Sequence, residues 1–309
     1  MAETSVLGRV NGAIACDAFC SLGDGLSHAV VLGDGGSLTD IVYEKSGQQR
    51  ERHTIGMAQD ARDVTAFWSD IDGVRNVIAV TSRGEVWHFS QSGSEPWSRT
   101  LRREVPDALR VAGYDEHHHG IVLTSSGEVT DQPFHGVSAA VAQAFKADTA
   151  AALERSGRSP AAAALDSAGP AEGEVEPPVV VGNVPAAVDV AALWADGGDR
   201  FVLLADRSGA IIEIGYGINQ PATRRTLATL PGLKNISACY VDDPATGRRV
   251  VALTETGEIH ELRYGIDPPR LGEPLISQSA ADIACFKTPD GDVHIVLVSN
   301  GQVIELMNG

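Results

Sequence analysis

The stretch RRVVALTETGEIHELRYG, residues 248–265, decides the fold of this chain. It begins with a β-branched run, turns through polar residues that end in Gly257, and continues with alternating apolar and polar residues. Two such runs joined by a short turn containing glycine predict an antiparallel β-hairpin. This hairpin is one of six, because the same pattern occurs at residues 27–44, 75–90, 119–134, 199–217 and 293–309.

The turn glycines of the six hairpins give the repeat its period. They are Gly36, Gly84, Gly127, Gly209, Gly257 and Gly301, at spacings of 48, 43, 82, 48 and 44 residues. A short apolar stretch ending in an aromatic residue precedes each hairpin, and a further strand-like segment follows several of them. Four strands in about 45 residues are typical of one propeller blade. The sequence therefore predicts an all-β fold, a six-bladed β-propeller that forms a single domain over residues 1–309.

The two ends of the chain complete the sixth blade in this interpretation. The last unit stops after its third strand, and the segment SVLGRV, residues 5–10, precedes the first unit without a place in it. Joining the ends gives a period of 44 residues between Gly301 and Gly36, close to the others. We therefore expect residues near 4 to 10 to supply the outer strand of blade 6 and to close the ring.

The spacing of 82 residues between Gly127 and Gly209 exceeds the period and indicates an insertion in blade 3. Within it, Val141, Phe145 and Ala152 recur near one helical face, and glycines supply the stop signals. We expect a helical insertion and an acidic linker at residues 138–176, between the third and fourth strands of blade 3. Three roles remain open for it: a local cap, an arm that binds a partner, and a disordered segment.

The composition excludes two classes of partner. There are 41 acidic and 24 basic side chains, which gives a net charge of −17 and a pI near 4.8. Such a chain repels phosphate backbones and anionic lipids, so we expect neither nucleic acid nor membrane as a partner. No stretch is long and apolar enough to span a bilayer, and the N-terminus lacks a signal-peptide pattern. The expected location is therefore cytoplasmic, with Cys16, Cys20, Cys239 and Cys285 as reduced thiols.

One acidic position recurs on the third strand of the repeat, four residues after each turn glycine. Its members, the third-strand acids, are Asp40, Asp131, Glu213, Glu261 and Glu305, and blade 2 has His88 there. These acids could form a multivalent ligand site. They could equally form salt bridges between blades or accept backbone amides, because a buried acid needs a partner and Arg83, Arg207, Arg248 and Arg249 lie nearby in the sequence.

The blade length, the G-x-[IV]-x-[ED] third strand and the N-terminal closing strand resemble those of the fucose-specific six-bladed lectins and related lectin-like propellers. The resemblance implies that sugar is held between blades by Arg, Glu and a stacked Trp or Tyr. The acidic position of this motif is present in five of the six units. The corresponding Arg and Trp are not evident, since Trp97 is the only Trp on a fourth strand.

A second set of polar residues, the axial ring, stands at the start of the innermost strands. Its members are Asp63, Arg110, Asp189, Asn235 and Asp282, and blade 1 has Ala13. These positions converge on one mouth of the central channel of a propeller, so we predict a ligand site there. The alternative is that each Asp caps the amides of its own loop.

Acidic turns give a weaker metal signal. Residues 115–119, DEHHH, place two His and an Asp in one turn, and residues 70–73, 242–243 and 289–292 resemble fragments of calcium loops. None has a complete ligand spacing, so we expect solvated turns, no metal and no other cofactor.

Motifs for a nucleophilic serine, a phosphate loop or a dinucleotide site are absent from the sequence. We therefore expect a non-catalytic binding or interaction protein that recognises a glycan or a protein partner. The alternative is an enzyme at the channel mouth that acts on a small molecule. In that case Asp63, Asp189 or Asp282 would serve as a base and Arg110 would hold an anionic or carbonyl group.

Overall fold

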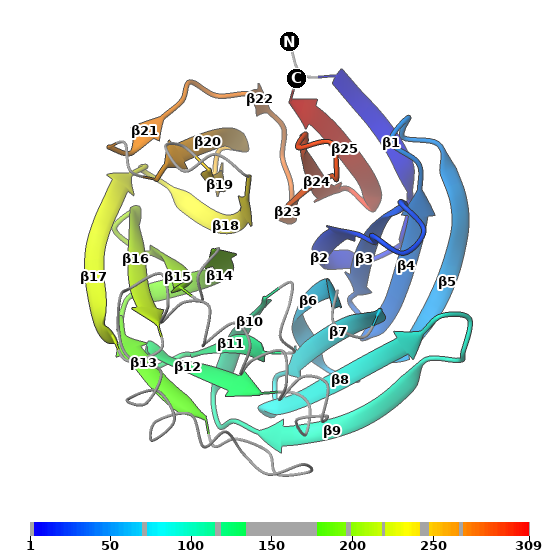
Figure 1. Ribbon diagram of the computed structural model, residues 1–309, viewed down its shortest axis with the longest axis horizontal. Coiled ribbons are helices and arrows are strands. Elements are labelled where there is room, and N and C mark those ends of the chain that lie inside the picture. The colour runs from blue at the N-terminus through cyan, green and yellow to red at the C-terminus, as the bar shows by residue number, and fades with distance from the viewer. Residues whose placement is uncertain are drawn as a thin grey trace, which may run out of the picture.

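The computed structural model describes residues 3–69, 73–114, 119–133, 178–195, 199–217, 220–241, 247–265 and 268–308. These residues form six antiparallel sheets arranged around a central axis (Figure 1), which confirms the all-β six-bladed propeller. From the axis outward, blade 1 contains β2 (Ala13–Cys20), β3 (Ser27–Gly33), β4 (Ser37–Tyr43) and β5 (Gln49–Met57). Blade 2 contains β6 (Ala61–Ser69), β7 (Val74–Thr81), β8 (Glu85–Ser92) and β9 (Ser98–Glu104).

The other four blades follow the same order. Blade 3 contains β10 (Ala108–Gly113), β11 (His119–Thr124), β12 (Glu128–Pro133) and β13 (Val179–Asn183). Blade 4 contains β14 (Ala187–Ala195), β15 (Asp199–Asp206), β16 (Ala210–Gly217) and β17 (Gln220–Thr229). Blade 5 contains β18 (Leu233–Tyr240), β19 (Arg248–Thr254) and β20 (Glu258–Tyr264), with the short β21 (Arg270–Leu271) and β22 (Ile276–Ser277) outside. Blade 6 contains β23 (Asp282–Lys287), β24 (Val293–Ser299), β25 (Gln302–Asn308) and β1 (Glu3–Arg9).

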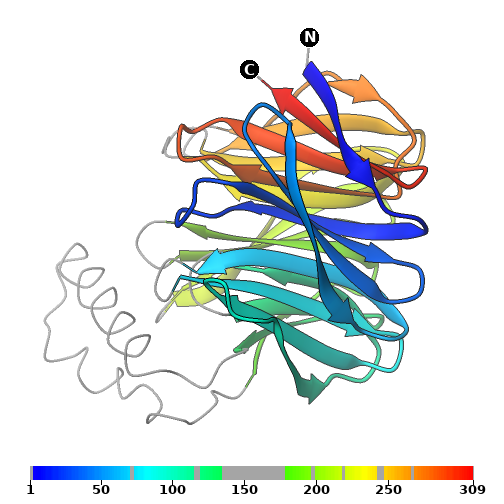
Figure 2. The same cartoon turned by 90° about the vertical axis from the view of Figure 1, so that its right-hand side faces the viewer.

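The two ends of the chain share the sheet of blade 6, and both termini lie beside each other (Figures 1 and 2). Strand β1 pairs antiparallel with β25, with Glu3 opposite Met307 and Arg9 opposite Gln302. A backbone hydrogen bond found in other blades also occurs in blade 6. The amide of Val10 donates to the carbonyl of Gly301 at 2.8 Å, as the amide of Val105 donates to Gly84 at 2.7 Å. The N-terminal segment thus supplies what the end of a fourth strand supplies elsewhere.

The turn glycines explain why the period is so regular. Gly84 has a φ of 81°, a left-handed conformation that favours glycine. A Cβ atom at this residue would lie 2.3 Å from the carbonyl oxygen of Val105. Conformation and close packing therefore both demand glycine at this position of the blade.

The hydrophobic core lies between the blades. Each buried cluster joins two successive sheets, as where Val31 and Tyr43 of blade 1 pack with Phe286 and Val296 of blade 6. The second strands are covered on both faces, and all seven residues of β24 are buried. This is why the second strand of each unit is a continuous apolar run rather than an alternating one.

Several features predicted from the sequence lie outside the described residues. These are the helical insertion at 138–176, residues 115–118 of the DEHHH run, and the acidic turns at 70–72 and 242–246. The turn at 289–292 is described, and Asp290 and Asp292 there contact the Lys45 ammonium at 2.6 and 2.7 Å. Across the described part of the chain, no helix has the length and apolarity needed to cross a membrane.

The contribution of β1 to stability can be tested with two adjacent substitutions. The side chain of Leu7 is 1% exposed in the core between blades 6 and 1, whereas Val6 is 56% exposed. We expect Leu7→Ala to lower the free energy of unfolding by about 2–5 kcal/mol and Val6→Thr to leave it nearly unchanged. Deleting residues 1–10 should destabilise the chain further and cause aggregation through the free edge of β25. A truncated chain that melts at the temperature of the full chain would contradict this account of ring closure.

Candidate sites in the central channel and between the blades

The structure places the axial ring at one level of the innermost strands. Asp63, Arg110, Asp189, Asn235 and Asp282 occupy equivalent positions, paired with Val80, Leu123, Ala205, Leu253 and Val298 of the second strands. The equivalent residue in blade 1 is Ala15, which pairs with Leu32, and not Ala13 as the sequence suggested. In blade 1 the ring position is itself an alanine, so no polar residue marks it in the sequence.

The three aspartates of the ring connect each blade to the next. Asp63 accepts from the amide of Val111 at 2.8 Å, and Asp189 accepts from the amide of Ile236 at 2.7 Å. Asp282 accepts from the amide of Cys16 at 2.9 Å, which joins blade 6 to blade 1. These contacts join two blades, whereas the alternative interpretation expected each Asp to cap its own loop. Asp189 and Asp282 also accept from the amides of Val190 and Ile283 in their own strands.

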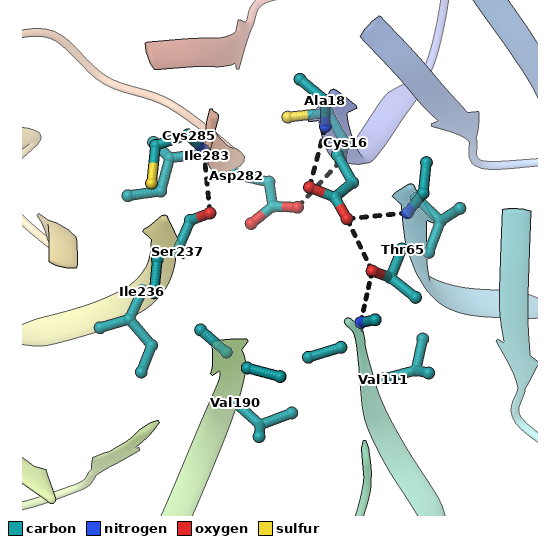
Figure 3. Close-up of a pocket in the computed structure, with 18 of the residues that line it drawn as sticks. Cys16, Ala18, Thr65, Val111, Val190, Ile236, Ser237, Asp282, Ile283 and Cys285 are labelled. Atoms are coloured by element: carbon teal, nitrogen blue, oxygen red, sulfur yellow. Dashed lines mark hydrogen bonds between the residues drawn. The ribbon is translucent and has the colours of Figure 1, made fainter. Parts of the chain in front are cut away.

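A second layer of similar bonds lies two residues further along the strands (Figure 3). Asp17 accepts from the amide of Ala66 at 2.8 Å and from the Thr65 hydroxyl at 2.6 Å. Thr65 in turn accepts from the amide of Gly113 at 2.8 Å. Ser237 accepts from the amide of Cys285 at 2.9 Å. The remaining interface, between blades 3 and 4, is crossed by Arg110, whose Nε lies 3.3 Å from Asp189 Oδ1.

Burial and crowding shift the pKa values of the ring carboxyls. Burial is the main cause that raises the pKa of Asp63 to about 8, with Arg110 opposing it and Asp282 and Asp189 adding to it. Burial likewise raises the pKa of Asp189 to about 7 and raises that of Asp282. The carboxylates hold the pKa of Arg110 above its ordinary value, Asp63 most strongly.

The channel is narrow where the aspartates face it. Its cavity volume is about 70 Å³, and Asp63, Asp189 and Asp282 line it, whereas Arg110 and Asn235 do not. At about 10–15 Å³ for each water, the cavity has room for about five to seven waters. Sites for drug-sized molecules measure about 300–1,000 Å³. The channel can thus hold ordered water against its carboxyls. Among the described residues, no group of three or more His, Cys, Asp or Glu side chains is arranged for a metal ion.

The third-strand acids lie between blades and are buried. Asp131 of blade 3 accepts from Arg200 Nη1 at 2.6 Å and from the Tyr216 hydroxyl at 3.0 Å, both in blade 4. His119 of its own blade lies 3.0 Å away through Nδ1. Burial raises the pKa of Asp131, but His119, Arg200 and Tyr216 outweigh it and hold this pKa below its usual range. Asp131 therefore forms a salt bridge between blades 3 and 4, which agrees with the interpretation of the third-strand acids as links between blades.

Two further interfaces follow the same plan. Glu213 of blade 4 lies 3.4 Å from Arg248 Nη1 of blade 5, and burial together with Glu213 raises the pKa of Tyr264 there. Glu305 of blade 6 accepts from the hydroxyl of Ser5 at 3.4 Å and lies 2.7 Å from its own blade's His294. Burial and Glu305 raise the pKa of Tyr43 in blade 1.

The interface of blades 5 and 6 differs. Glu261 accepts from Arg249 Nη1 at 3.1 Å and from Arg263 at 2.7 and 2.9 Å, all within blade 5. In blade 6, Val293 and Asn308 occupy the register positions that Arg248 and Tyr264 have in blade 5. A paired arginine and glutamate from one blade therefore stand at this interface.

Some partners of the third-strand acids stand at a fixed spacing from them in the sequence. Twelve residues before a third-strand acid, on the second strand, stand His28, His119 and Arg249. His28 Nδ1 lies 3.0 Å from Asp40. Of the four arginines proposed as partners, Arg248 and Arg249 contact third-strand acids and Arg83 pairs with Glu85 instead. Within the described residues, Arg207 forms no ion pair with an acid.

No protein-family model matches the sequence, and no curated protein matches it. Solved structures do match the fold. AofleA from Arthrobotrys oligospora has a TM-score of 0.67 at 11% identity, over all of this chain and 86% of its own. The fucose-specific lectin from Aleuria aurantia has a TM-score of 0.64 at 13% identity, over 96% of this chain and 91% of its own. The SapL1 lectin, solved with α-methyl fucoside, has a TM-score of 0.63 at 14% identity, over 98% and 95%.

This chain has the fold of the six-bladed lectins. The resemblance noted in the sequence is therefore confirmed for the architecture, with structural neighbours that include fucose-specific lectins at low identity. At such identities the likeness concerns the fold, and the binding residues must be argued from this chain's own side chains.

The axial ring predicts a specific dependence of stability on pH. An unfolded Asp titrates near a pKa of about 3.9, so between about pH 4 and pH 8 the folded state binds more protons at Asp63 and Asp189. Their stabilising contribution is fully present below pH 4 and is lost as the pH rises through this range. Asp63→Asn removes one titration and keeps an acceptor for Val111, so the decline in unfolding free energy should become shallower. Urea unfolding at several pH values measures it.

The control for this experiment is Asp206→Asn. Asp206 is half-buried. Burial raises the pKa of its carboxyl, but Ser208 and nearby amides outweigh it and hold this pKa below its usual value, so its titration lies outside the range. An unchanged slope in Asp63→Asn would mean that the ring carboxyls stay ionised in the folded protein.

Proposed function

We propose that this protein is a non-catalytic glycan-binding protein and that the interface of blades 5 and 6 binds the sugar. The observation that carries the proposal is the pair formed by Arg249 and Glu261 within one blade. The resemblance to the fucose-specific lectins implies that Arg and Glu side chains between blades hold the sugar. The 12-residue spacing of Arg249 and Glu261 puts this pair on adjacent strands.

The chemistry of the pair suits neighbouring hydroxyl groups. A carboxylate accepts and a guanidinium donates, and hydrogen bonds with one charged partner are stronger than neutral ones. The side chains of Arg249 and Arg263 are 13% and 49% exposed, whereas Glu261 is 6% exposed. A sugar can therefore reach the arginines from solvent while Glu261 stays oriented by them.

The other interfaces support a small number of sugar sites rather than six equal ones. At Asp131 and Glu213, arginine and tyrosine side chains of the next blade already occupy the space beside the acid. A sugar hydroxyl there would have to displace bonds that join two blades. At the interface of blades 5 and 6, Glu261 is bound by Arg249 and Arg263 of its own blade. Glu213, by contrast, is bound both by Arg225 of its own blade and by Arg248 of the next.

An enzyme at the channel mouth remains the second candidate, because the raised pKa of Asp63 is typical of a catalytic base. The narrow cavity and the amide bonds that occupy the ring aspartates favour a structural role instead. A protein partner is the other class of ligand for the binding function. The sugar site between blades 5 and 6, the enzyme at the channel mouth and the protein partner predict different effects of substitutions on ligand binding.

The test is a titration with α-methyl fucoside, together with a glycan array, on the wild type and on Arg249→Ala and Glu261→Gln. Losing one charge-assisted bond costs about 1.5–3 kcal/mol, so we expect affinity to fall by about tenfold to a hundredfold. Arg83→Ala is the matched control, since Arg83 is 60% exposed and pairs with Glu85 away from this interface. Melting temperatures verify that each variant is folded.

Two outcomes would contradict the proposal. Glycan binding that is unchanged in Arg249→Ala and lost in Asp189→Asn would move the site to the channel. A wild-type protein that binds no glycan on the array would leave a protein partner as the ligand.

A further inference from the structure

Three exposed apolar side chains share one position of the outer strands. Each lies opposite the residue that precedes the third-strand position of its blade: Val6 opposite Ile304, Leu101 opposite Trp87 and Val180 opposite Thr130. Their exposed fractions are 56%, 41% and 61%. Blades 6, 2 and 3 thus each carry an exposed apolar side chain at the same place, which we call the outer apolar position.

Val6 lies on the face of blade 6 that turns toward blade 5. Directly opposite residues of an antiparallel pair have their side chains on the same face of the sheet, so Val6 shares the face of Ile304. Ile304 belongs to the core between blades 5 and 6, together with Ile259 of β20. Glu261 follows Ile259 by two residues and has the same orientation, and Arg249 is bonded to it. Val6 and the arginine–glutamate pair therefore belong to opposite sides of one interface.

The interface of blades 5 and 6 combines two features that the described residues do not combine at the other two outer apolar positions. It has an exposed apolar side chain on one blade and, on the preceding blade, an acid bound by arginines of its own blade. In blade 1, which precedes blade 2, Asp40 is paired with His28 instead. In blade 2, which precedes blade 3, His88 stands in place of the acid. This comparison singles out Val6.

The two sides of this interface offer different chemistry. Blade 5 presents charged donors and acceptors, which are Arg249, Arg263 and Glu261. Blade 6 presents hydrophobic side chains, with Val293 buried and Val6 exposed at the outer strand. A pyranose divides in the same way, because its hydroxyls project from the edge of the ring and its C–H groups form apolar patches on the faces. A sugar bound by the arginine–glutamate pair can therefore bury C–H groups against Val6.

Val6 belongs to the strand that closes the ring. The N-terminal segment is held by the pairing of β1 with β25 and by the bond from the Val10 amide to the Gly301 carbonyl. Arg249 and Glu261 belong to blade 5 and are bonded to each other within it. Separation of β1 from β25 would therefore remove Val6 from the interface and leave the charged pair in place.

We propose that Val6 forms the apolar side of the sugar site between blades 5 and 6, so that sugar binding stabilises the docked N-terminal strand. The inference rests on the proposed function and adds to it a binding residue and a link to ring closure. A ligand that binds one state of a protein more tightly shifts the equilibrium toward that state. The sugar should therefore oppose the separation of β1 from β25.

The first test is the affinity of Val6→Thr for α-methyl fucoside, measured by titration calorimetry. The substitution keeps the shape of the side chain and replaces one methyl group by a hydroxyl. We expect the affinity to fall by about threefold to tenfold because apolar contact is lost, with the melting temperature of the free protein nearly unchanged. Val180→Thr is the matched control, since Val180 has the equivalent position on blade 3, and its affinity should equal that of the wild type.

The second test is hydrogen exchange at the amide of Val10, which opens when the N-terminal segment leaves β25. With α-methyl fucoside at ten times its Kd, exchange at this amide should slow by about tenfold, because the open state does not bind the sugar. The amide of Val105 is the matched control. It donates to Gly84 at 2.7 Å through the equivalent bond in blade 2, and its exchange rate should stay the same.

The proposal requires both results. Fucoside binding that is lost in Arg249→Ala but unchanged in Val6→Thr would overturn it and leave the proposed function standing. Equal exchange behaviour of Val10 and Val105 when the sugar is bound would overturn the link to ring closure in the same way. A wild type that does not bind the fucoside overturns this inference, and a wild type that binds no glycan on the array overturns the proposed function with it.

Discussion

The structure depends on satisfying the inner edge of every blade. The innermost strand of each sheet is an edge strand, and its free amides face a channel with room for few waters. A buried amide without an acceptor costs about 1–3 kcal/mol. Side chains of the preceding blade supply the acceptors, as Asp63 does for Val111, Asp189 for Ile236 and Asp282 for Cys16. In the described residues, a side chain of one blade accepts an amide of the next blade at five of the six interfaces, and Arg110 bridges blades 3 and 4 through Asp189. The ring aspartates therefore join the blades.

The same arrangement occurs further from the axis, where it varies from blade to blade. Asp131 is held by an arginine of the next blade, and Glu213 by one arginine of its own blade and one of the next. Glu261 is held by arginines of its own blade, and His88 replaces the acid in blade 2. Where the next blade supplies the partners, the polar group is used for assembly. At the interface of blades 5 and 6, Val293 and Asn308 stand at the positions where blade 5 has Arg248 and Tyr264, and this is the interface that we propose for the sugar. The six repeats thus share one architecture but offer unequal sites.

Much of the fold was predictable, because its determinants are local in the sequence. The turn glycines demand a left-handed conformation, and the apolar second strands reflect burial on both faces, so both mark every blade. The site was harder to predict. The axial ring was correctly expected to share one level of the channel, but Asp63 meets an amide 48 residues away, which no local pattern reveals. The ring position of blade 1 is Ala15 and not Ala13, because the pairing of β2 with β3 sets the register. The bond from Arg200 to Asp131 spans 69 residues and the insertion of blade 3, so only the folded ring shows it.

The central claim is that ligands bind between blades and that the channel is a structural element. The most direct measurement is an amide chemical-shift titration of the whole chain with α-methyl fucoside. The account predicts shifts near Arg249 and Glu261 and unchanged signals for the channel amides of Cys16, Val111 and Ile236. Saturable shifts confined to those three channel amides would contradict it.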